Sequence, residues 1–134
     1  MKVTELGHVS LFVRDFDASL RFYRDVLGLA ETGRGKGGRI AFLSAGVHHH
    51  DVSLEMARSE GSVHERGAPG LYHIAFSVGA RREDLAAARR EVEGHGLHPF
   101  GEAEGNTPSF CVRDPDGHQI ELYVDPAGRP SPPD

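Results

Sequence analysis

The feature of this sequence that most constrains its fold is a pattern that occurs twice, about 65 residues apart. In the first copy, the alternating run GHVSLFV at residues 7–13 predicts a strand, and apolar residues at helical spacing follow at residues 17–29. In the second copy, YHIAFSV at residues 72–78 precedes a similar helical pattern at residues 82–97. Glycines fall near the end of both helical patterns, where helices commonly stop. The chain is therefore expected to fold into two similar modules.

Short strand-like runs after each helix complete the two patterns. The clearest of them lie at residues 40–45, 51–56, 109–114 and 119–124. Each half therefore reads as βαβββ, which places the chain in the α+β class with modules at about residues 1–60 and 70–126. The charged, glycine-bearing segment at residues 58–70 is interpreted as a linker, and the proline-rich residues 127–134 as a loose tail.

The glycine-rich segment GRGKGGR at residues 33–39 raises the question of a phosphate-binding loop. Dinucleotide-binding loops lead into the N-terminus of a helix, whereas this segment precedes a strand-like run. A hairpin loop is therefore the better interpretation.

Composition excludes several classes of function. A single cysteine, Cys111, rules out an internal disulfide framework, and the N-terminal residues lack the apolar run of a secretory signal, so a cytoplasmic location is expected. No stretch approaches the roughly 20 apolar residues that span a bilayer. A net charge of −5 with scattered lysines and arginines offers no phosphate-binding stripe. We therefore expect neither a membrane nor a nucleic acid as partner.

Four of the predicted strands each carry a possible metal ligand opposite an apolar column. Side chains at alternate positions of a strand point to opposite faces, so the two columns can be compared directly. The four ligands are His8, Glu55, His73 and Glu121. The two histidines are 65 positions apart and the two glutamates 66 apart, as a duplication predicts.

Two imidazoles and two carboxylates form a suitable site for a divalent ion if the modules bring these strands together. Such ligands suit Fe, Mn, Ni, Co or Zn, and an ion with open coordination positions can polarise an oxygenated small-molecule substrate. Glu55 lies in a shorter strand, so a solvent-facing role stays open for it. Tyr123 shares the column of Glu121, where it either hydrogen-bonds substrate or lines the cavity.

The remaining histidines divide into two groups. His48, His49 and His50 form a run before a predicted strand, where a solvated loop competes with a functional role. The others fall in linkers, helix ends or turns, and no role is assigned to His64, His95, His98 or His118.

Four segments carry a resemblance to a known family: residues 7–29, the HHDVSL run at 49–54, LYHIAFSV at 71–78 and VRDPDGHQIELYVD at 112–125. With them the chain resembles the vicinal oxygen chelate superfamily, which includes glyoxalase I, extradiol dioxygenases and bleomycin-resistance proteins. The resemblance implies a single domain at residues 1–126, in which two βαβββ modules form a cupped, mostly antiparallel sheet around a central metal cavity. It implies His8, His73 and Glu121 as metal ligands, and a homodimer.

Two catalytic branches of this superfamily compete. Resemblance to the extradiol dioxygenases implies that His49 or His50, with His50 preferred, acts as an acid or base near bound substrate. This chain departs from that branch at Cys111, where a tyrosine is typical, and at residues 102–105, where a histidine is typical.

The glyoxalase branch uses four protein ligands, which would include Glu55 and let it share proton transfer with Glu121. The sequence thus predicts a metal-dependent dioxygenase or a lyase or isomerase acting on a vicinally oxygenated substrate. The alternative is a non-catalytic resistance protein that binds a small molecule or antibiotic.

Overall fold

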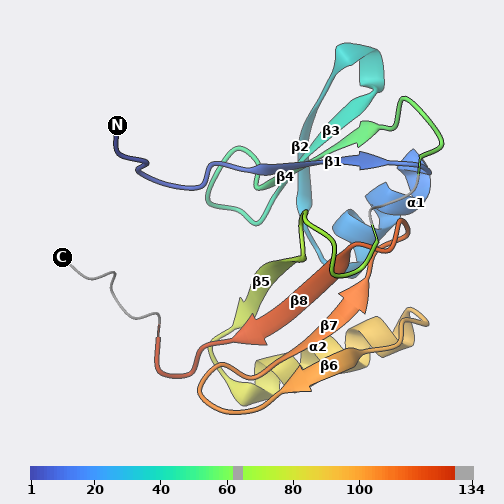
Figure 1. The fold of residues 1–134 in the computed structure, drawn as a ribbon. Coiled ribbons are helices and arrows are strands. Elements are labelled where there is room, and N and C mark those ends of the chain that lie inside the picture. The colour runs from blue at the N-terminus through green and yellow to red at the C-terminus, as the bar shows by residue number, and fades with distance from the viewer. Residues whose placement is uncertain (62–64, 129–134) are drawn as a thin grey trace. The chain divides into compact units, whose positions relative to one another are not determined.

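The computed structural model describes residues 1–61 and 65–128, and it divides into two compact units, residues 1–62 and 63–134 (Figure 1). The first unit contains β1 (Val9–Val13), α1 (Phe16–Leu20), a π-helix (Arg21–Val26), β2 (Ala30–Gly35), a 3-10 turn (Lys36–Gly38), β3 (Ile40–Ser44) and β4 (Val52–Met56). The second contains β5 (His73–Gly79), α2 (Arg82–Gly94), β6 (Phe100–Ala103), β7 (Ser109–Arg113) and β8 (Gln119–Val124). Both units are βαβββ modules, so the predicted α+β class is confirmed.

The two sheets have the same topology. Their strand orders are β1-β4-β3-β2 and β5-β8-β7-β6, so the last strand of each module lies beside its first strand. The pairs β1–β4 and β5–β8 are parallel, and the other neighbouring strands are antiparallel. The helix and the two strands that follow it together form the long connection between the members of each parallel pair.

Helix α1 begins at a residue that the sequence marks clearly. The carboxylate of Asp15 accepts a hydrogen bond from the backbone N–H of Ala18 at 3.0 Å, which satisfies one of the free N–H groups of the first turn. The helix then widens into the π-helix, where the N–H of Leu27 donates to the carbonyl of Phe22, five residues earlier. Gly28, with a φ of 76°, ends the helical segment in the left-handed region as the sequence predicts.

Helix α2 is longer and regular. Its first turn is closed by Asp84, whose carboxylate accepts from the backbone N–H of Arg81 at 2.9 Å. Val92 is buried on the inner face of the helix. The helix contacts β5 and β8 and covers one face of their sheet (Figure 1). On that face Ile120, Leu122 and Val124 are buried, while the intervening residues of β8 are only partly covered. This alternation follows the period of two expected of a half-buried strand.

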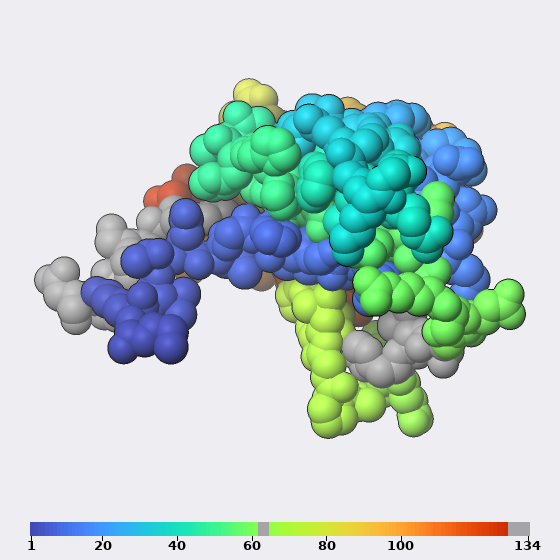
Figure 2. Space-filling view, turned by 90° about the horizontal axis from the view of Figure 1, so that it is seen from above, coloured from blue at the N-terminus to red at the C-terminus, as the bar shows by residue number. Residues whose placement is uncertain are grey.

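The first module has a comparable core. Leu11 and Val13 of β1 and Leu54 of β4 are buried, and Tyr23 and Leu20 of the helical segment are buried with them. The N-terminal residues extend away from this packed body (Figure 2), and Met1, Val3 and Leu6 are exposed.

Several details lie beyond what the sequence patterns resolve. Strands β2 and β6 have no alternation of apolar residues in the sequence, since glycine or charged residues interrupt both, although burial alternates along β2. The predicted hairpin at residues 33–39 is confirmed: Gly35 pairs with Ile40, and the 3-10 turn joins β2 to β3. The predicted tail at residues 127–134 lies mostly outside the described residues. Within the described part of the chain, no helix is long and apolar enough to cross a membrane.

Candidate metal-binding site

His73 and Glu121 come together in the second module. His73 opens β5, and Glu121 lies on β8 opposite Ala75 in the parallel register. The His73 Nε2 atom is 3.0 Å from the Glu121 Oε2 atom, and both side chains are about a quarter to a third exposed. Two predicted ligands that are 48 positions apart in sequence therefore meet at one point.

The geometry of this pair fits a shared divalent ion. Nitrogen and oxygen ligands lie about 2.1 Å from such an ion, so two of them at right angles are about 3.0 Å apart. The other ring nitrogen, His73 Nδ1, is buried without a hydrogen-bond partner in the described part of the chain. A buried polar atom is normally paired, so the site as it stands accommodates a further group.

The neighbours of Glu121 on the sheet are Tyr123, Gln119 and Cys111. Tyr123 and Gln119 flank Glu121 on the same, partly covered face of β8. Cys111 of β7 is the register partner of Glu121, and its Sγ accepts a hydrogen bond from Gln119 Nε2 at 3.4 Å. Burial raises the pKa of the Cys111 thiol, so this residue stays in its neutral form beside the carboxylate.

In the first module, His8 lies in a group of aromatic rings. His8 directly precedes β1, and its ring centroid is 4.5 Å from that of His50. His50 also contacts Phe42, with ring centroids 4.8 Å apart. The Nδ1 atoms of His49 and His50 are 2.8 Å apart, so one ring donates a hydrogen bond to the other. The histidine run is thus folded onto the predicted ligand His8.

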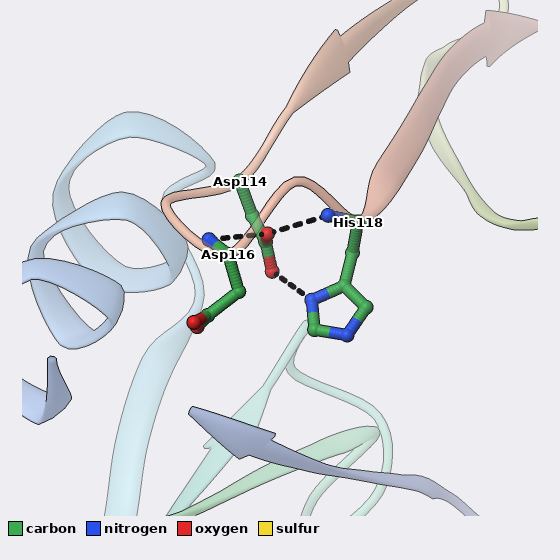
Figure 3. Close-up of side chains that lie close together, drawn as sticks. All are labelled: Asp114, Asp116 and His118. Atoms are coloured by element: carbon green, nitrogen blue, oxygen red, sulfur yellow. Dashed lines mark hydrogen bonds and ion pairs between the residues drawn. The ribbon is translucent and has the colours of Figure 1, made fainter. Parts of the chain in front are cut away.

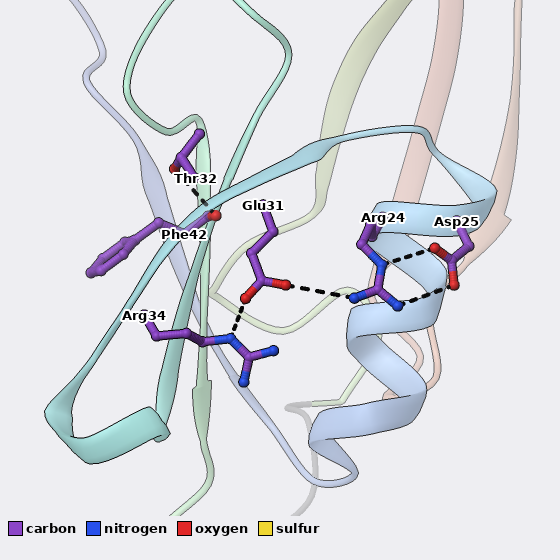
Figure 4. A network of polar contacts seen from close by, with 6 residues as sticks. All are labelled: Arg24, Asp25, Glu31, Thr32, Arg34 and Phe42. Carbon is purple, nitrogen blue, oxygen red and sulfur yellow. Dashed lines mark hydrogen bonds and ion pairs between the residues drawn. The ribbon is translucent and has the colours of Figure 1, made fainter.

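Side-chain hydrogen bonds fix the backbone of the histidine run. Thr32 Oγ1 on β2 donates to the carbonyl of His49 at 2.7 Å, and it also lies 3.3 Å from the carbonyl of Phe42 (Figure 4). Ser44 Oγ donates to the carbonyl of His48 at 2.6 Å. The histidine run is therefore a loop whose backbone is fixed by hydrogen bonds from Thr32 and Ser44.

Ion pairs hold β2 against the helical segment. Glu31 on β2 pairs with Arg34 and, at 3.6 Å, with Arg24, which in turn contacts Asp25 (Figure 4). These contacts fix the strand that carries Thr32. The carboxylate of Glu31 has a lowered pKa chiefly because Arg34 donates a hydrogen bond to it.

The environment of His50 favours its neutral form. Desolvation by burial, followed by the neighbouring rings of His8 and His49, lowers the pKa of His50. Burial disfavours the charged imidazolium, so His50 is neutral near pH 7. A neutral imidazole in this position is able to accept a proton.

The spacing argument that matched Glu55 with Glu121 is wrong. His8 precedes the first strand of its module, and His73 opens the first strand of the other. Two positions after each histidine, Ser10 pairs with Ser53 and Ala75 pairs with Glu121. The first-module equivalent of Glu121 is therefore Ser53, which is buried and donates to Ser10 Oγ at 2.8 Å. The equivalent of Glu55 in the second module is Tyr123.

Glu55 has other partners. Its carboxylate accepts hydrogen bonds from Lys36 Nζ at 2.9 and 3.0 Å and lies 3.4 Å from Arg58 Nη2. The hydrogen bond from Lys36 is the main reason that the pKa of Glu55 is lowered. Both cations come from its own module, so this glutamate is already neutralised.

A second group of potential ligands lies in the turn between β7 and β8. Asp114, Asp116 and His118 offer ligand atoms within 4.8 Å of one another (Figure 3). Asp114 accepts from the backbone N–H groups of Asp116 at 3.0 Å and His118 at 2.8 Å, and from His118 Nδ1 at 2.8 Å. These bonds explain the turn before β8 without a metal ion, and we assign none to it.

His118 was given no role from the sequence, yet it has the best-defined partner of the histidines described here. The hydrogen bond to the buried Asp114 carboxylate raises the pKa of His118. The residues DPDG at 114–117 indicate a tight turn, but the pairing of aspartate and histidine depends on how that turn closes.

Comparison with known proteins places this fold and these residues in a family. Residues 5–122 match the Glyoxalase/Bleomycin resistance protein/Dioxygenase superfamily, and the chain belongs to that superfamily. Its members include dioxygenases, lyases of the glyoxalase type and fosfomycin-resistance proteins. The predicted resemblance to the vicinal oxygen chelate proteins is confirmed.

Individual relatives span several activities. The chain is 35% identical over 127 residues to a catechol-2,3-dioxygenase of Bacillus subtilis (strain 168), covering 91% of this chain but only 42% of that protein. It is 31% identical over 119 residues to the glutathione transferase FosA of Serratia marcescens, covering 89% of this chain and 79% of that protein. The crystal structure of a glyoxylase/bleomycin resistance protein/dioxygenase domain from Frankia sp. EAN1pec has a TM-score of 0.74 and 27% identity, covering 92% and 99% of the two chains. One further relative is described as a manganese-dependent dioxygenase.

Proposed function

We propose that this protein is a divalent-metal-dependent enzyme of the dioxygenase type, acting on a small substrate that presents two adjacent oxygens. His8, His73 and Glu121 would hold the ion. The observation that carries the proposal is the 3.0 Å separation between His73 Nε2 and Glu121 Oε2, which suits two ligands of one ion.

The register of the first module favours three protein ligands over four. Ser53 occupies the position where a second carboxylate would be expected, and Glu55 is neutralised by Lys36 and Arg58. Two histidines and one carboxylate leave several coordination positions open, an arrangement typical of non-haem iron oxygenases. We therefore leave Glu55 out of the ligand set, although iron, manganese, cobalt, nickel and zinc all accept these ligands.

When bound, a divalent ion would polarise the two substrate oxygens and lower the pKa of their hydroxyl groups. His50 is the base that we assign to this chemistry. Its Nδ1 atom faces His49, so Nε2 is the atom available to accept a proton from a substrate hydroxyl. His49 holds the His50 ring in place, and the lowered pKa of His50 keeps that ring neutral before the transfer. Tyr123, on the face of Glu121, is proposed to hydrogen-bond the substrate.

A second candidate function is transfer of a group to an oxygenated substrate. Cys111 stands where extradiol dioxygenases typically have a tyrosine, and the relative FosA is a transferase of which this chain covers 79%. The lyase or isomerase reaction and simple binding of a small molecule are the remaining outcomes of the test below.

The first part of the test measures the metal site. Wild-type protein is expected to bind about one Mn²⁺ per chain in calorimetry, and Glu121→Gln to weaken binding by more than about 100-fold, beyond the loss typical of an outer-shell partner. Glu55→Gln is the matched control and is expected to retain wild-type affinity. Full metal stoichiometry in Glu121→Gln would contradict the proposal.

The second part measures the reaction. Oxygen uptake by the Fe(II)- or Mn(II)-loaded protein with catechols is compared with isomerisation of thiohemiacetals and with thiol consumption. Oxygen uptake is expected, and His50→Gln is expected to lower kcat by about 100-fold or more while metal affinity stays unchanged. Turnover only in the other two assays would replace the dioxygenase assignment. Light scattering in the same buffer tests the homodimer that we propose, with twice the 14.6 kDa chain mass expected.

A further inference from the structure

A pocket of about 200 Å³ lies within the second module, at the end of the sheet where β5 and β8 begin. Its polar lining residues are Arg66, Tyr72, Arg113, His118 and Gln119, and Ala68, Leu71 and three glycines complete the wall. None of the proposed metal ligands lines it. The pocket is therefore a separate feature from the His73–Glu121 pair.

The lining of this pocket has an unusual charge for this protein. The chain carries 20 acidic and 15 basic residues, yet the pocket is lined by two arginines and a histidine and by no carboxylate. Asp116, in the neighbouring turn, is not among the lining residues. A wall with several N–H donors and cationic groups favours an anion over a neutral ligand.

Arg113 is held in place before any ligand arrives. Its Nη1 donates to the carbonyl of Gly117 at 3.1 Å, and its guanidinium lies 4.8 Å from the ring centroid of Phe100. One hydrogen bond leaves most of the five N–H groups of a guanidinium for other acceptors. A fixed guanidinium suits a carboxylate or a phosphoryl group, which it binds through two parallel hydrogen bonds.

His118 is oriented by the turn that precedes β8. The buried Asp114 carboxylate accepts from His118 Nδ1, so the Nε2 edge of the ring points away from that carboxylate (Figure 3). Gly117, with a φ of 90°, has open space where a Cβ would stand, so a ligand is able to approach the backbone here.

The pocket adjoins the proposed metal site. Tyr72 lines the pocket and contacts His73, with ring centroids 4.6 Å apart, and Gln119 is the register partner of His73. A small molecule anchored in the pocket would therefore extend toward His73 and Glu121.

We propose that this pocket binds an oxyanion group, a carboxylate or a phosphoryl group, carried by the substrate. Arg66 and Arg113 neutralise the group, and His118 Nε2 and the backbone near Gly117 complete its hydrogen bonds. The statement that the anion is part of the substrate rests on the proposed function. Anion binding itself does not, because the pocket belongs wholly to the second module. It narrows the substrate class to small vicinally oxygenated molecules with an anionic substituent.

The test uses the metal-free full chain, so that an anion cannot bind through a metal ion. Inorganic phosphate and acetate are titrated in separate experiments at constant ionic strength, with backbone amide chemical shifts as the readout. Saturable shifts at residues 117–119 are expected, and the anion with the lower Kd identifies the substituent. Arg113→Gln and, independently, Arg66→Gln are expected to raise that Kd about tenfold or more, since each removes charged hydrogen bonds. Arg90→Gln, an exposed arginine of α2 in the same module, is the control and is expected to leave the Kd unchanged.

Absence of saturable shifts with both anions would overturn the proposal, as would a wild-type Kd in both arginine variants. The exposed Arg66 variant keeps the test decisive if Arg113→Gln disturbs the fold. Mn²⁺ affinity is measured on the same samples. Loss of metal binding with intact phosphate or acetate binding would count against the proposed function alone, and the reverse result would count against the pocket alone.

Discussion

The two modules share one topology but differ at the positions that matter for chemistry. The parallel pair β1–β4 brings Ser10 opposite Ser53 in the first module, and the parallel pair β5–β8 brings Ala75 opposite Glu121 in the second. The first pair is a part-buried hydrogen bond between hydroxyl groups, whereas the second leaves a carboxylate 3.0 Å from a histidine. The two modules therefore have matching strand register but different side chains at equivalent positions.

The loops before the last strand of each module, β4 and β8, also differ in length and in the residues that fix them. In the second module, residues 114–118 form a short turn organised by one buried aspartate. In the first module, the longer loop carries His48, His49 and His50 and is held by separate bonds from Ser44 and Thr32. One copy thus carries the carboxylate that we propose as a metal ligand, and the other carries the histidine that we propose as a base. Three experiments test the contrast between the two modules.

The largest effect is expected from giving the first module the carboxylate of the second. Ser53→Glu would bury an unpaired charge at a site that is 2% exposed, so the metal-free protein should lose about 3–5 kcal/mol in its free energy of unfolding. Urea unfolding followed by circular dichroism measures this loss. Mn²⁺ should recover part of it if position 53 is equivalent to position 121.

Ser53→Ala is the control for that experiment. It removes the hydrogen bond to Ser10 without adding a charge and should cost only about 1 kcal/mol. Equal destabilisation by the two variants would show that the site tolerates a carboxylate, and the contrast drawn between the modules would then fail.

A smaller effect is expected from removing the aspartate that stabilises each of the two loops. Asp114 has a fully buried side chain that accepts three hydrogen bonds, so Asp114→Ala should cost about 2–4 kcal/mol in the free energy of unfolding. Asp51, before β4, accepts from the backbone N–H of Ala45 at 2.7 Å, so Asp51→Ala should cost about 1 kcal/mol. Thermal and urea unfolding of the two variants side by side measure the difference. A larger loss in Asp51→Ala would reverse our view of which loop depends on its aspartate.

The smallest effect is a pH dependence that arises from His118 in the second module. Asp114 raises the pKa of His118 in the folded protein, so the folded state binds this proton more tightly than the unfolded chain does. The resulting stability is fully present below the unfolded pKa of about 6.5 and is lost as the pH rises through the folded pKa. The destabilisation caused by His118→Gln should therefore be about 1 kcal/mol greater at pH 5.5 than at pH 8.5.

Urea unfolding at several pH values measures this difference, and His95→Gln, which removes an exposed imidazole at the end of α2, corrects for general effects of losing a histidine. A constant difference between wild type and His118→Gln across the range would mean that the ion pair adds nothing to the neutral hydrogen bond.

The sequence alone predicts the duplicated βαβββ pattern, because the periods of two and 3.6 residues are local properties of the chain. It also placed His73 and Glu121 opposite the apolar columns of their strands, since alternation along a strand fixes the face of each side chain. The glycine that ends the helical segment of the first module was readable for the same local reason.

The equivalence of residues between the two modules could be assigned only from the strand register of the folded chain. Val9 pairs with Val52, 43 positions later, whereas Ile74 pairs with Ile120, 46 positions later, so equal spacing along the chain misassigned Glu55. Register depends on the lengths of the intervening loops and hairpins, which strand patterns do not record. The contact of His50 with His8 and the pairing of Asp114 with His118 depend on loop closure in the same way. Such contacts form between side chains, and their geometry is set by the way the loops pack against the sheets.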